Sequence, residues 1–551
     1  MPPAELPRSQ GRWASFSVAV LALGATASGL GNQFTQDELP LILRNEAVHT
    51  VTAPIRIFRQ AYWHDPFPPA LYRPLATSVL AVQWVAGGGR PVVFRWGSLA
   101  LLVGAGLCLL RLARLILPAP AAWAAAALFV VHPVHVEATA PAVNQGELAV
   151  GLLCFLATAV YIRERRRGPI RPPAMASLVV LYLAAALFKE NALVLPGLFL
   201  AAEFTVLAPE RTDPLRPAQI RPLYLLLALT ATVVLAARAA VLGGNAIGAP
   251  PSEALAGSSL IGRVLTMLAV APHWARLLFW PARLQADYGP NEIVAANGWG
   301  AGQWAGLLVV GVWVSLVLGL RRRLPVIAFG LLWIAVAILP VSNILVATSV
   351  TLGERTLFLA SGGAVLVLGG VLASVWPSPA ARRAPIRIAV LFPVMALVAV
   401  GTYRSGVRDR VWHDQRTLLW QTVQDAPRSY ASHLALSRFL EDSGNGAEAL
   451  AHYREAAALK PALPDLERGM ADQYRMAGLC EPAIRHYRRV MALRPDDVPV
   501  RSSLVACLLR MERYPEVPAA AAPGLGDPGA GAYFKDAIRK ADSALGRSGG
   551  G

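Results

Sequence analysis

The sequence predicts an all-α protein in which a polytopic helical membrane domain precedes a short solenoid of helical repeats. Of the 551 residues, 55% are hydrophobic and only 15% are charged, which is too apolar for one ordinary soluble domain. The hydrophobic residues form nearly uncharged runs of roughly 20 residues, each long enough to cross a bilayer as a helix. These runs stop after Arg404, and a 34-residue period follows.

The apolar runs predict about eleven membrane spans. The spans begin near Trp13, Val92, Pro120, Glu147, Ala174, Ala192, Pro222, Gly302, Pro325, Thr356 and Ile386. An odd number of spans places the two termini on opposite sides of the membrane. We expect residues 1–12 in the cytoplasm, because Arg8 and Arg12 precede the first span. A cleaved signal peptide is the alternative for the first run, which is long for that purpose.

Arginines gather in short clusters between the apolar runs. The clusters are Arg111 and Arg114; Arg163 with Arg165 to Arg167; Arg211, Arg216 and Arg221; Arg321 to Arg323; and Arg382, Arg383 and Arg387. All of them fall on the cytoplasmic side of the predicted topology, as the positive-inside rule requires. They account for much of the net charge of +17 without forming one basic face, so we expect no nucleic-acid partner.

Two further apolar stretches, Leu71 to Ala86 and Leu260 to Trp280, fit the topology only if they do not cross singly. The first is short, and the second is interrupted by Arg263, Pro272 and Arg276. We interpret both as helices that lie at the outer interface or re-enter it. The alternative is that both cross, which would place several basic loops outside the cytoplasm.

The C-terminal part repeats every 34 residues, with prolines at Pro427, Pro461 and Pro495. This period is typical of tetratricopeptide repeats, in which each helical hairpin buries its apolar face by stacking on its neighbours. The predicted domains are a membrane domain at 13–404 with an external first loop at 32–91, a connector at 405–428, repeats at 429–518 and a Pro/Gly/Ala-rich tail at 519–551. The predicted topology puts the repeats outside the cytoplasm.

Ionisable residues beside the spans, on the predicted external side, are the candidate site residues. Asp37 and Glu38 follow the first span, where a partly desolvated carboxylate can act as a general base. An ordinary solvated acidic loop is the plainer alternative. Arg73, Lys189 and Arg355 can bind a phosphate, although snorkelling explains a lone arginine and pairing with Glu190 explains the lysine.

A second group of candidates lies at His132, His135 and Glu137, with Glu354 beside the phosphate candidate Arg355. The two histidines are three residues apart around a proline, which differs from the HExxH zinc motif, so we expect no metal. Hydrogen bonding to a phosphate or sugar hydroxyl needs the same donors with looser geometry. The four cysteines show no CxxC spacing, and a zinc or redox motif is therefore unsupported.

Six segments carry a family resemblance: FTQDE, YRPL, ALFVVHPVHVEA, LFKENAL, GERTLFLASGG and VWHDQRTLLWQTVQDAP. At these residues the chain resembles the C-type glycosyltransferase (GT-C) superfamily. It is most similar to the transmembrane and tetratricopeptide repeat proteins implicated in protein O-mannosylation. The resemblance covers roughly residues 13 to 500.

The resemblance implies that the first external loop carries a catalytic acid and that a polyprenyl-phosphate sugar binds from the membrane. The family's acidic pair falls on Asp37 and Glu38, with Glu where many relatives have a second Asp. Asn144 and Glu147 lie where relatives usually show a Gly-Arg-Asp-like segment. The repeats are then on the catalytic side, where they would hold an acceptor polypeptide.

The sequence therefore predicts a hexosyltransferase that moves a sugar, mannose by resemblance, from polyprenyl phosphate to a protein Ser or Thr. The expected location is the outer face of a bacterial inner membrane. Asp37 would take the acceptor proton while Arg73, Lys189, Arg355 and a histidine stabilise the leaving phosphate. We expect membrane lipid as a partner and no cofactor besides the donor. The alternatives are a non-catalytic membrane-anchored repeat scaffold for envelope proteins and a carrier of a lipid-linked substrate.

Overall fold

The computed structural model describes residues 8–52, 54–63, 67–210, 217–244, 251–289, 291–376 and 384–546. Throughout these ranges the regular structure is helical, and the described chain has one isolated β-bridge, between Trp63 and Ala70. The all-α prediction is confirmed. The chain divides into a membrane unit, Met1–Ala286 with Ile293–Leu418, and a repeat unit, Asp287–Glu292 with Leu419–Gly551.

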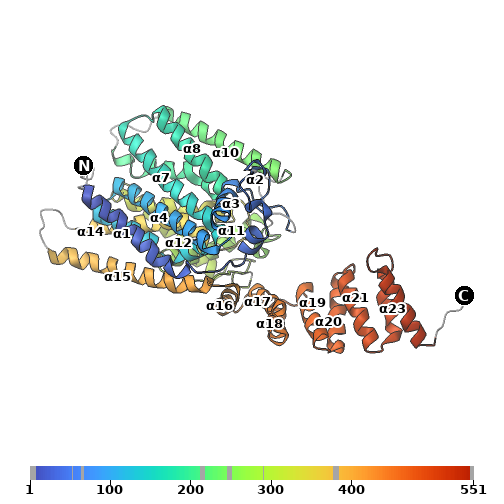
Figure 1. The fold of residues 1–551 in the computed structure, drawn as a ribbon. Coiled ribbons are helices and arrows are strands. Elements are labelled where there is room, and N and C mark those ends of the chain that lie inside the picture. Colours follow the sequence, from blue (N-terminus) through green and yellow to red (C-terminus); the bar gives the residue numbers. More distant parts are fainter. Residues whose placement is uncertain are drawn as a thin grey trace. The chain divides into compact units, whose positions relative to one another are not determined.

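The membrane unit contains α1 to α15 and the start of α16 (Figure 1). The bounds are α1 Arg8–Thr26, α2 Pro54–Phe58, α3 Pro74–Gly87, α4 Pro91–Ile116, α5 Ala119–Val130, α6 Val136–Thr139, α7 Gln145–Arg167, α8 Pro172–Phe188, α9 Leu195–Phe204, α10 Arg221–Val241, α11 Leu260–Phe279, α12 Ala301–Leu320, α13 Pro325–Ile338, α14 Phe358–Val375, α15 Ala384–Asp409 and α16 Gln415–Asp425. Several start with a proline, whose missing N–H costs nothing in the first turn.

Six described helices are long and apolar enough to cross a bilayer, or seven if the bent pair of α5 and residues 133–139 counts as one. The six are Pro91–Ile116, Ala142–Arg167, Arg221–Val241, Ala301–Leu320, Glu354–Val375 and Ala389–Trp412. Shorter apolar helices occupy Pro74–Gly87, Pro172–Phe188 and Pro325–Val341. The chain is a membrane protein, while about eleven spans stays a prediction.

The structure describes only some of the arginine clusters on which the predicted topology rests. Arg211, Arg216, Arg382 and Arg383 lie outside the described residues. The predicted stretch at 71–86 is mostly the short helix α3, and the one at 260–280 is α11 with Pro272 inside it. Whether either crosses the membrane, and which face is cytoplasmic, stay predictions.

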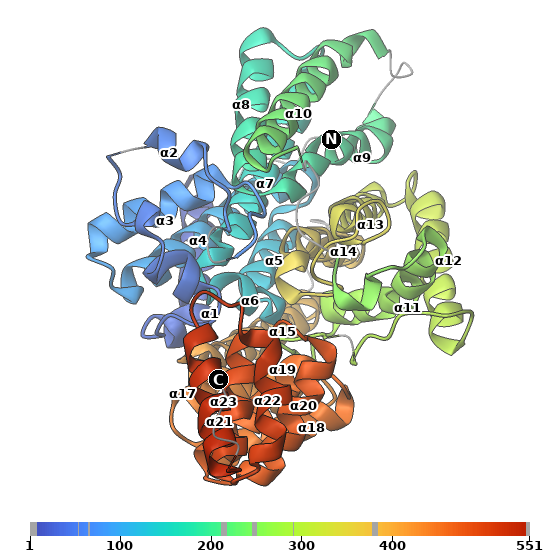
Figure 2. The same ribbon diagram turned by 90° about the vertical axis from the view of Figure 1, so that its right-hand side faces the viewer.

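The membrane unit is closely packed where α13 crosses α14, which Figure 2 shows side by side. The backbones meet at Gly330 and Gly363, where a Cβ on either glycine would lie 2.5 Å from the carbonyl oxygen of the other. Nearby, the buried Trp333 indole donates to the Leu359 carbonyl oxygen at 2.8 Å. Small residues at such crossings let helix backbones approach closely in a membrane.

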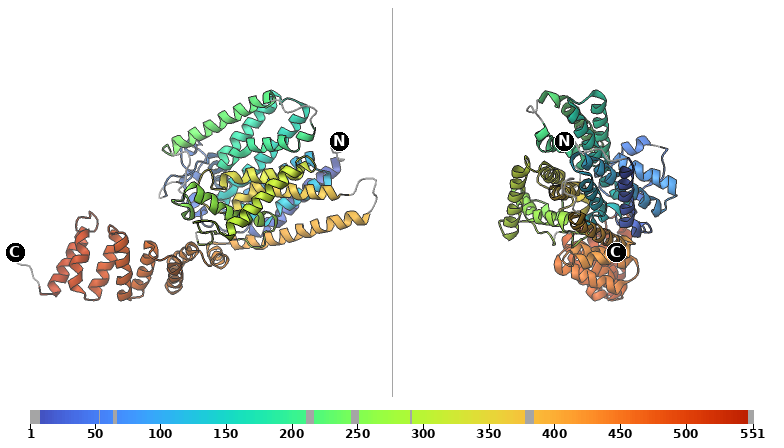
Figure 3. Two further views of the ribbon diagram at one scale, coloured as in Figure 1. Left: turned by 180° about the vertical axis from the view of Figure 1, so that it is seen from behind. Right: turned by 90° about the vertical axis from the view of Figure 1, so that its left-hand side faces the viewer.

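The long helix α15 runs along α1, and the contact anchors the beginning of the first loop (Figures 1 and 3). The Ser28 hydroxyl donates to the Gly406 carbonyl oxygen at 2.8 Å, and the Asn32 amide donates to the Asp409 carbonyl oxygen at 2.9 Å. The chain therefore leaves α1 in a fixed direction.

The repeat unit is a series of helices that pack against their neighbours in sequence. They are α17 Tyr430–Asp442, α18 Gly446–Leu459, α19 Pro464–Met476, α20 Cys480–Leu493, α21 Val498–Arg510, α22 Val517–Ala521 and α23 Gly531–Ala544. The starts of α17 and α19 are 34 residues apart, as are those of α18 and α20, in step with the sequence period. This supports the repeat interpretation, and the tetratricopeptide solenoid stays a prediction.

Two boundaries of the repeat unit differ from the expected ones. The described part of the predicted tail, residues 519–546, contains α23, which buries Phe534, Ala537 and Ala541 in the unit's core. Residues 547–551 of that tail lie outside the described residues. The segment Asp287–Glu292 also belongs to this unit, where Asp287 accepts hydrogen bonds from the Ser429 and Ser432 hydroxyls at 2.6 and 2.8 Å.

Replacing Gly363 with alanine should destabilise the membrane unit. The new methyl group would overlap the Gly330 carbonyl, and forcing α13 and α14 apart should cost about 1–3 kcal/mol. Gly319→Ala in α12 is the matched control, because a Cβ there meets nothing within 4 Å. Thermal unfolding of the two detergent-purified variants measures the difference. Equal unfolding midpoints would contradict the tight crossing.

Candidate functional site

The membrane unit contains a cavity of about 800 Å³, the candidate site. It is bounded by the first loop, the turn after α8, the end of α10 and the segment that follows α13. Its charged lining residues are Asp37, Arg73, Lys189, Glu190, Arg238 and Arg355, and its apolar wall includes Leu193, Leu235, Val341, Leu345 and Val346. The fold thus brings together five of the predicted site residues, from three of these segments.

The position of Asp37 follows from how the first loop is held. The Gln33 amide donates to the His413 carbonyl oxygen, and the Gln36 amide donates to the Gln415 side chain, both at 2.8 Å. Gln36 has φ = 44°, a left-handed conformation that is uncommon for residues other than glycine. Such a conformation persists where surrounding contacts impose it, and here it turns the chain immediately before Asp37.

Glu38 is held by a different set of contacts and does not line the cavity. Its carboxylate is fully buried and forms a two-pronged ion pair with Arg95 of α4, with N–O distances of 2.6 and 3.0 Å. It also accepts the backbone amides of Thr35 and Ala142, at 2.9 and 2.7 Å. With both oxygens engaged, Glu38 is suited to position the loop, and the geometry does not favour the catalytic role predicted for it.

Asp37, in contrast, is accessible within the cavity and has no hydrogen bond or ion pair to another described side chain. Although the carboxyl group is open to the cavity, the surrounding protein displaces much of the water near it and raises its pKa above the ordinary value. The positive charges of Arg355 and Arg73 oppose this rise, and the negative charge of Glu137 adds to it. A carboxylate with a raised pKa is a better proton acceptor.

Glu190 holds the side chain of Arg73, the residue that directly precedes α3. Two guanidinium nitrogens bind the two carboxylate oxygens at 3.1 and 2.6 Å, and Arg238 lies 3.7 Å from the same carboxylate. Burial opposes ionisation of Glu190, but Arg73, Lys189 and Arg238 outweigh it and hold the pKa of Glu190 far below its usual range. Glu190 therefore stays charged and keeps Arg73 in one orientation.

Lys189 lies in the turn between α8 and the short helix η6, Glu190–Val194. Its ammonium group pairs with Glu147 of α7, whose other oxygen accepts the Asn191 amide at 2.7 Å. Burial lowers the pKa of Lys189, with Glu147 partly compensating. An anion in the cavity would favour the charged lysine further.

Arg355 is oriented by Glu137, which binds its guanidinium and accepts its backbone amide at 2.8 Å. Glu137 can reach it because the chain bends by 44° between α5 and residues 133–139. Asn144 lines the cavity and donates to the Glu137 carbonyl oxygen at 2.8 Å. Glu137 thus orients a cation from behind the cavity wall.

The remaining predicted residues are not part of the cavity lining. His132 hydrogen-bonds the Leu278 carbonyl oxygen at 3.1 Å, and His135 hydrogen-bonds the Ser361 hydroxyl at 2.7 Å. Glu354 is buried and accepts the Gln285 amide at 2.6 Å. These contacts fasten the helix break to its neighbours, and the sugar- or phosphate-binding role predicted for the three residues is not favoured. Among described residues, no group of three or more potential metal-ligating side chains is found.

Sequence reasoning missed two arginines of this region. Arg95, in α4, fixes Glu38, and Arg238, in α10, lines the cavity. Both belong to long apolar helices, Arg95 near the start of α4 and Arg238 in the last turn of α10, and a charge in such a helix is expensive and marks a functional candidate by default. The sequence shows these two charges within apolar helices. It does not show their partners, Glu38 and Glu190, which lie far away along the chain.

Removing the Glu38 carboxylate should destabilise the fold strongly. Glu38→Ala leaves the buried Arg95 guanidinium without its counter-ion, a change that typically costs about 3–5 kcal/mol. Glu46→Ala is the control, since Glu46 is an exposed carboxylate in the same loop. Thermal unfolding in detergent gives the comparison. If the two variants unfold at the same temperature, the ion pair does not hold the loop.

Comparison with known proteins finds no matching family model. It does find homologues. Human protein O-mannosyl-transferase TMTC4 is 23% identical over 80% of this chain and 66% of its own length. The nematode Caenorhabditis elegans protein O-mannosyl-transferase F38B6.6 is 22% identical over 83% of this chain and 64% of its own.

A shorter match is more similar: Drosophila melanogaster protein O-mannosyl-transferase Tmtc2 is 32% identical over 32% of this chain and 20% of its own length. The chain spans about two thirds or less of these curated relatives. The resemblance predicted from the six sequence segments is confirmed: the chain is a homologue of the transmembrane and tetratricopeptide repeat proteins that are named protein O-mannosyl-transferases.

Proposed function

We propose that the chain is a membrane glycosyltransferase that moves a hexose from a polyprenyl-phosphate carrier to a protein hydroxyl at the Asp37 cavity. One observation carries the proposal: among the described residues Asp37 has no ion pair, and it faces a cavity whose other lining charges include Arg73, Lys189 and Arg355. The names of the relatives support mannose as the sugar and protein as the acceptor. The apolar lining suits the first part of a lipid chain.

In the proposed reaction the acceptor oxygen forms a bond to the anomeric carbon as the bond from that carbon to the phosphate oxygen breaks. Asp37 takes the acceptor proton, and polyprenyl phosphate leaves with the bonding electron pair. A direct displacement of this kind inverts the configuration at the anomeric carbon. No group besides the donor and acceptor is needed to balance the reaction.

The charges around the cavity suit this redistribution. Arg73, Lys189, Arg238 and Arg355 are matched by Asp37, Glu137, Glu147 and Glu190, four cations against four anions. Protonation of Asp37 removes one negative charge as the leaving phosphate gains one. Arg355 and Arg73, which act electrostatically on Asp37, can then stabilise the charge on the phosphate without moving. Such fixed charges are the basis of electrostatic preorganisation.

The scaffold alternative requires no proton acceptor. A scaffold would have no need for a carboxylate that faces a cavity lined by Arg73, Lys189 and Arg355 and that has no ion pair among the described residues. A carrier would need charges near the middle of the membrane. The cavity residues lie at the ends of helices and in loops, which favours the transferase.

Asp37→Asn should abolish transfer. The amide keeps the shape of the side chain but cannot accept the proton, and loss of a general base typically reduces the rate by roughly 10²–10⁴-fold. Transfer of radiolabelled mannose and glucose from polyprenyl phosphate to membrane protein is measured at equal expression. Glu46→Gln, an exposed carboxamide substitution in the same loop, should transfer like the wild type. If Asp37→Asn transfers at the wild-type rate, Asp37 is not the base.

Transfer should depend on pH through the same carboxyl group. Asp37 works as a base only when deprotonated, and its pKa is raised by burial. Transfer is therefore complete above the raised pKa and is lost as the pH falls through it, with a midpoint above the ordinary value of about 3.9. The pH profile of kcat/KM measures this. A midpoint at the ordinary value, or the same acid limb in the residual activity of Asp37→Asn, would contradict the assignment.

A further inference from the structure

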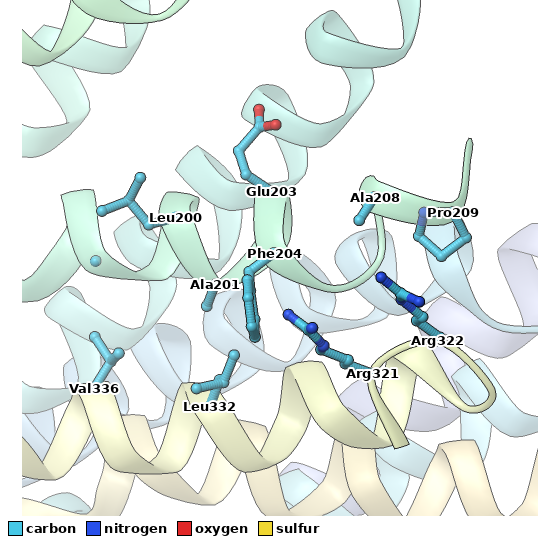
Figure 4. Close-up of a pocket in the computed structure, with 11 residues that line it drawn as sticks. Leu200, Ala201, Glu203, Phe204, Ala208, Pro209, Arg321, Arg322, Leu332 and Val336 are labelled. Atoms are coloured by element: carbon cyan, nitrogen blue, oxygen red, sulfur yellow. The ribbon is translucent and has the colours of Figure 1, made fainter. Parts of the chain in front are cut away.

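A second hollow in the membrane unit, which we call the α9–α13 trough, is lined by none of the residues assigned to the proposed reaction. It has a volume of about 980 Å³ and lies between α9 and α13 (Figure 4). Its lining residues are Gly197, Leu200, Ala201, Glu203, Phe204, Ala208, Pro209, Arg321, Arg322, Leu332 and Val336. The trough is apolar along its length, with two guanidinium groups at one end.

The arginine end lies at the opposite end of α9 from the Asp37 cavity. Residues just before α9, Leu193 and Val194, line the cavity, whereas Phe204 at its C-terminus lines the trough. Gly197 and Val336 line both, and a Cβ on Gly197 would lie 3.0 Å from the Val336 side chain. The ten residues of α9 span about 15 Å. The two hollows therefore adjoin, but their charged ends are separated.

The two arginines have no carboxylate partner in the part of the chain that the structure describes, unlike their basic neighbours. Arg165 pairs with Glu203 at 2.7 Å, and Arg166 pairs with Glu210 at 2.6 Å. Figure 4 shows the Glu203 side chain turned away from Arg321 and Arg322. The Arg321 guanidinium lies 4.6 Å from the centre of the Phe204 ring, which holds it beside the apolar wall.

We propose that the α9–α13 trough binds an anionic phospholipid, with the headgroup phosphate on Arg321 and Arg322 and an acyl chain between α9 and α13. The chemistry of the two ends matches that of such a lipid. Two guanidinium groups at the end of α12 form a phosphate-binding pair at the membrane interface, and Leu200, Phe204 and Leu332 provide an apolar wall beside them. A neutral phospholipid would leave the excess positive charge unbalanced.

The same turn provides a matched control. Arg323 follows Arg322 directly and is also exposed, but it does not line the trough. Arg322→Gln and Arg323→Gln therefore remove the same charge from adjacent positions, and only the first changes the proposed site. Leu200→Trp tests the apolar part, because this half-exposed side chain can be enlarged to fill the trough without disturbing the core.

The test measures lipid retained by the full-length protein purified in detergent. Equal amounts of palmitoyl-oleoyl phosphatidylglycerol and phosphatidylcholine are added, and lipid bound after gel filtration is quantified by mass spectrometry. Wild type and Arg323→Gln should retain phosphatidylglycerol over phosphatidylcholine by roughly thirtyfold, the effect expected of two interfacial arginines. Arg322→Gln should lose most of this preference, and Leu200→Trp should retain little of either lipid.

Three results would overturn the proposal. Equal retention of the two lipids would remove the anionic specificity. Equal losses in Arg322→Gln and Arg323→Gln would show a diffuse charge effect instead of a site. Displacement of phosphatidylglycerol by added polyprenyl phosphate, in an Arg322-dependent manner, would assign the trough to the polyprenyl lipid. Unfolding midpoints of the variants, measured alongside, confirm that each loss occurs in folded protein.

Discussion

The buried ion pair between Glu38 and Arg95 determines where the first loop can lie. A carboxylate and a guanidinium removed from water must stay together, because separating them inside the protein leaves an uncompensated charge. The pair joins the loop to α4, and the amides of Thr35 and Ala142 complete the shell around the carboxylate. Asp37 precedes Glu38 in the chain, so the ion pair also determines where Asp37 enters the cavity. The other cavity charges can act on a substrate together with Asp37 only while this position is kept.

The same requirement for local neutrality organises the rest of the cavity. Glu190 orients Arg73, Glu147 orients Lys189 and Glu137 orients Arg355. Each cation is therefore present at the cavity surface with its partner behind or beside it. This arrangement holds several like charges close together without mutual repulsion dominating, so that a single anionic ligand can meet all of them at once.

The sequence was sufficient to predict the helical class, the division into two parts and the set of loops that meet at the cavity, because hydrophobic periodicity and charged segments are local properties. The family resemblance favoured Asp37 as the base, but the sequence could not show what Glu38 does, since that depends on Arg95, 57 residues later and in an apolar helix. The histidines were misleading for the same reason: His135 has ligand chemistry, but its surroundings of Phe129, Phe358 and Ser361 make it a packing residue.

The small segment Asp287–Glu292 has a consequence for how the protein can be divided. It comes from between α11 and α12, yet Asp287 accepts hydrogen bonds from the hydroxyls that begin α17. A chain cut once near residue 418 would thus separate the start of α17 from the carboxylate to which Ser429 and Ser432 donate. The repeats are not an interchangeable cassette: any recombinant exchange of this array, in the laboratory or in evolution, must carry along a piece of loop that is encoded more than a hundred residues earlier.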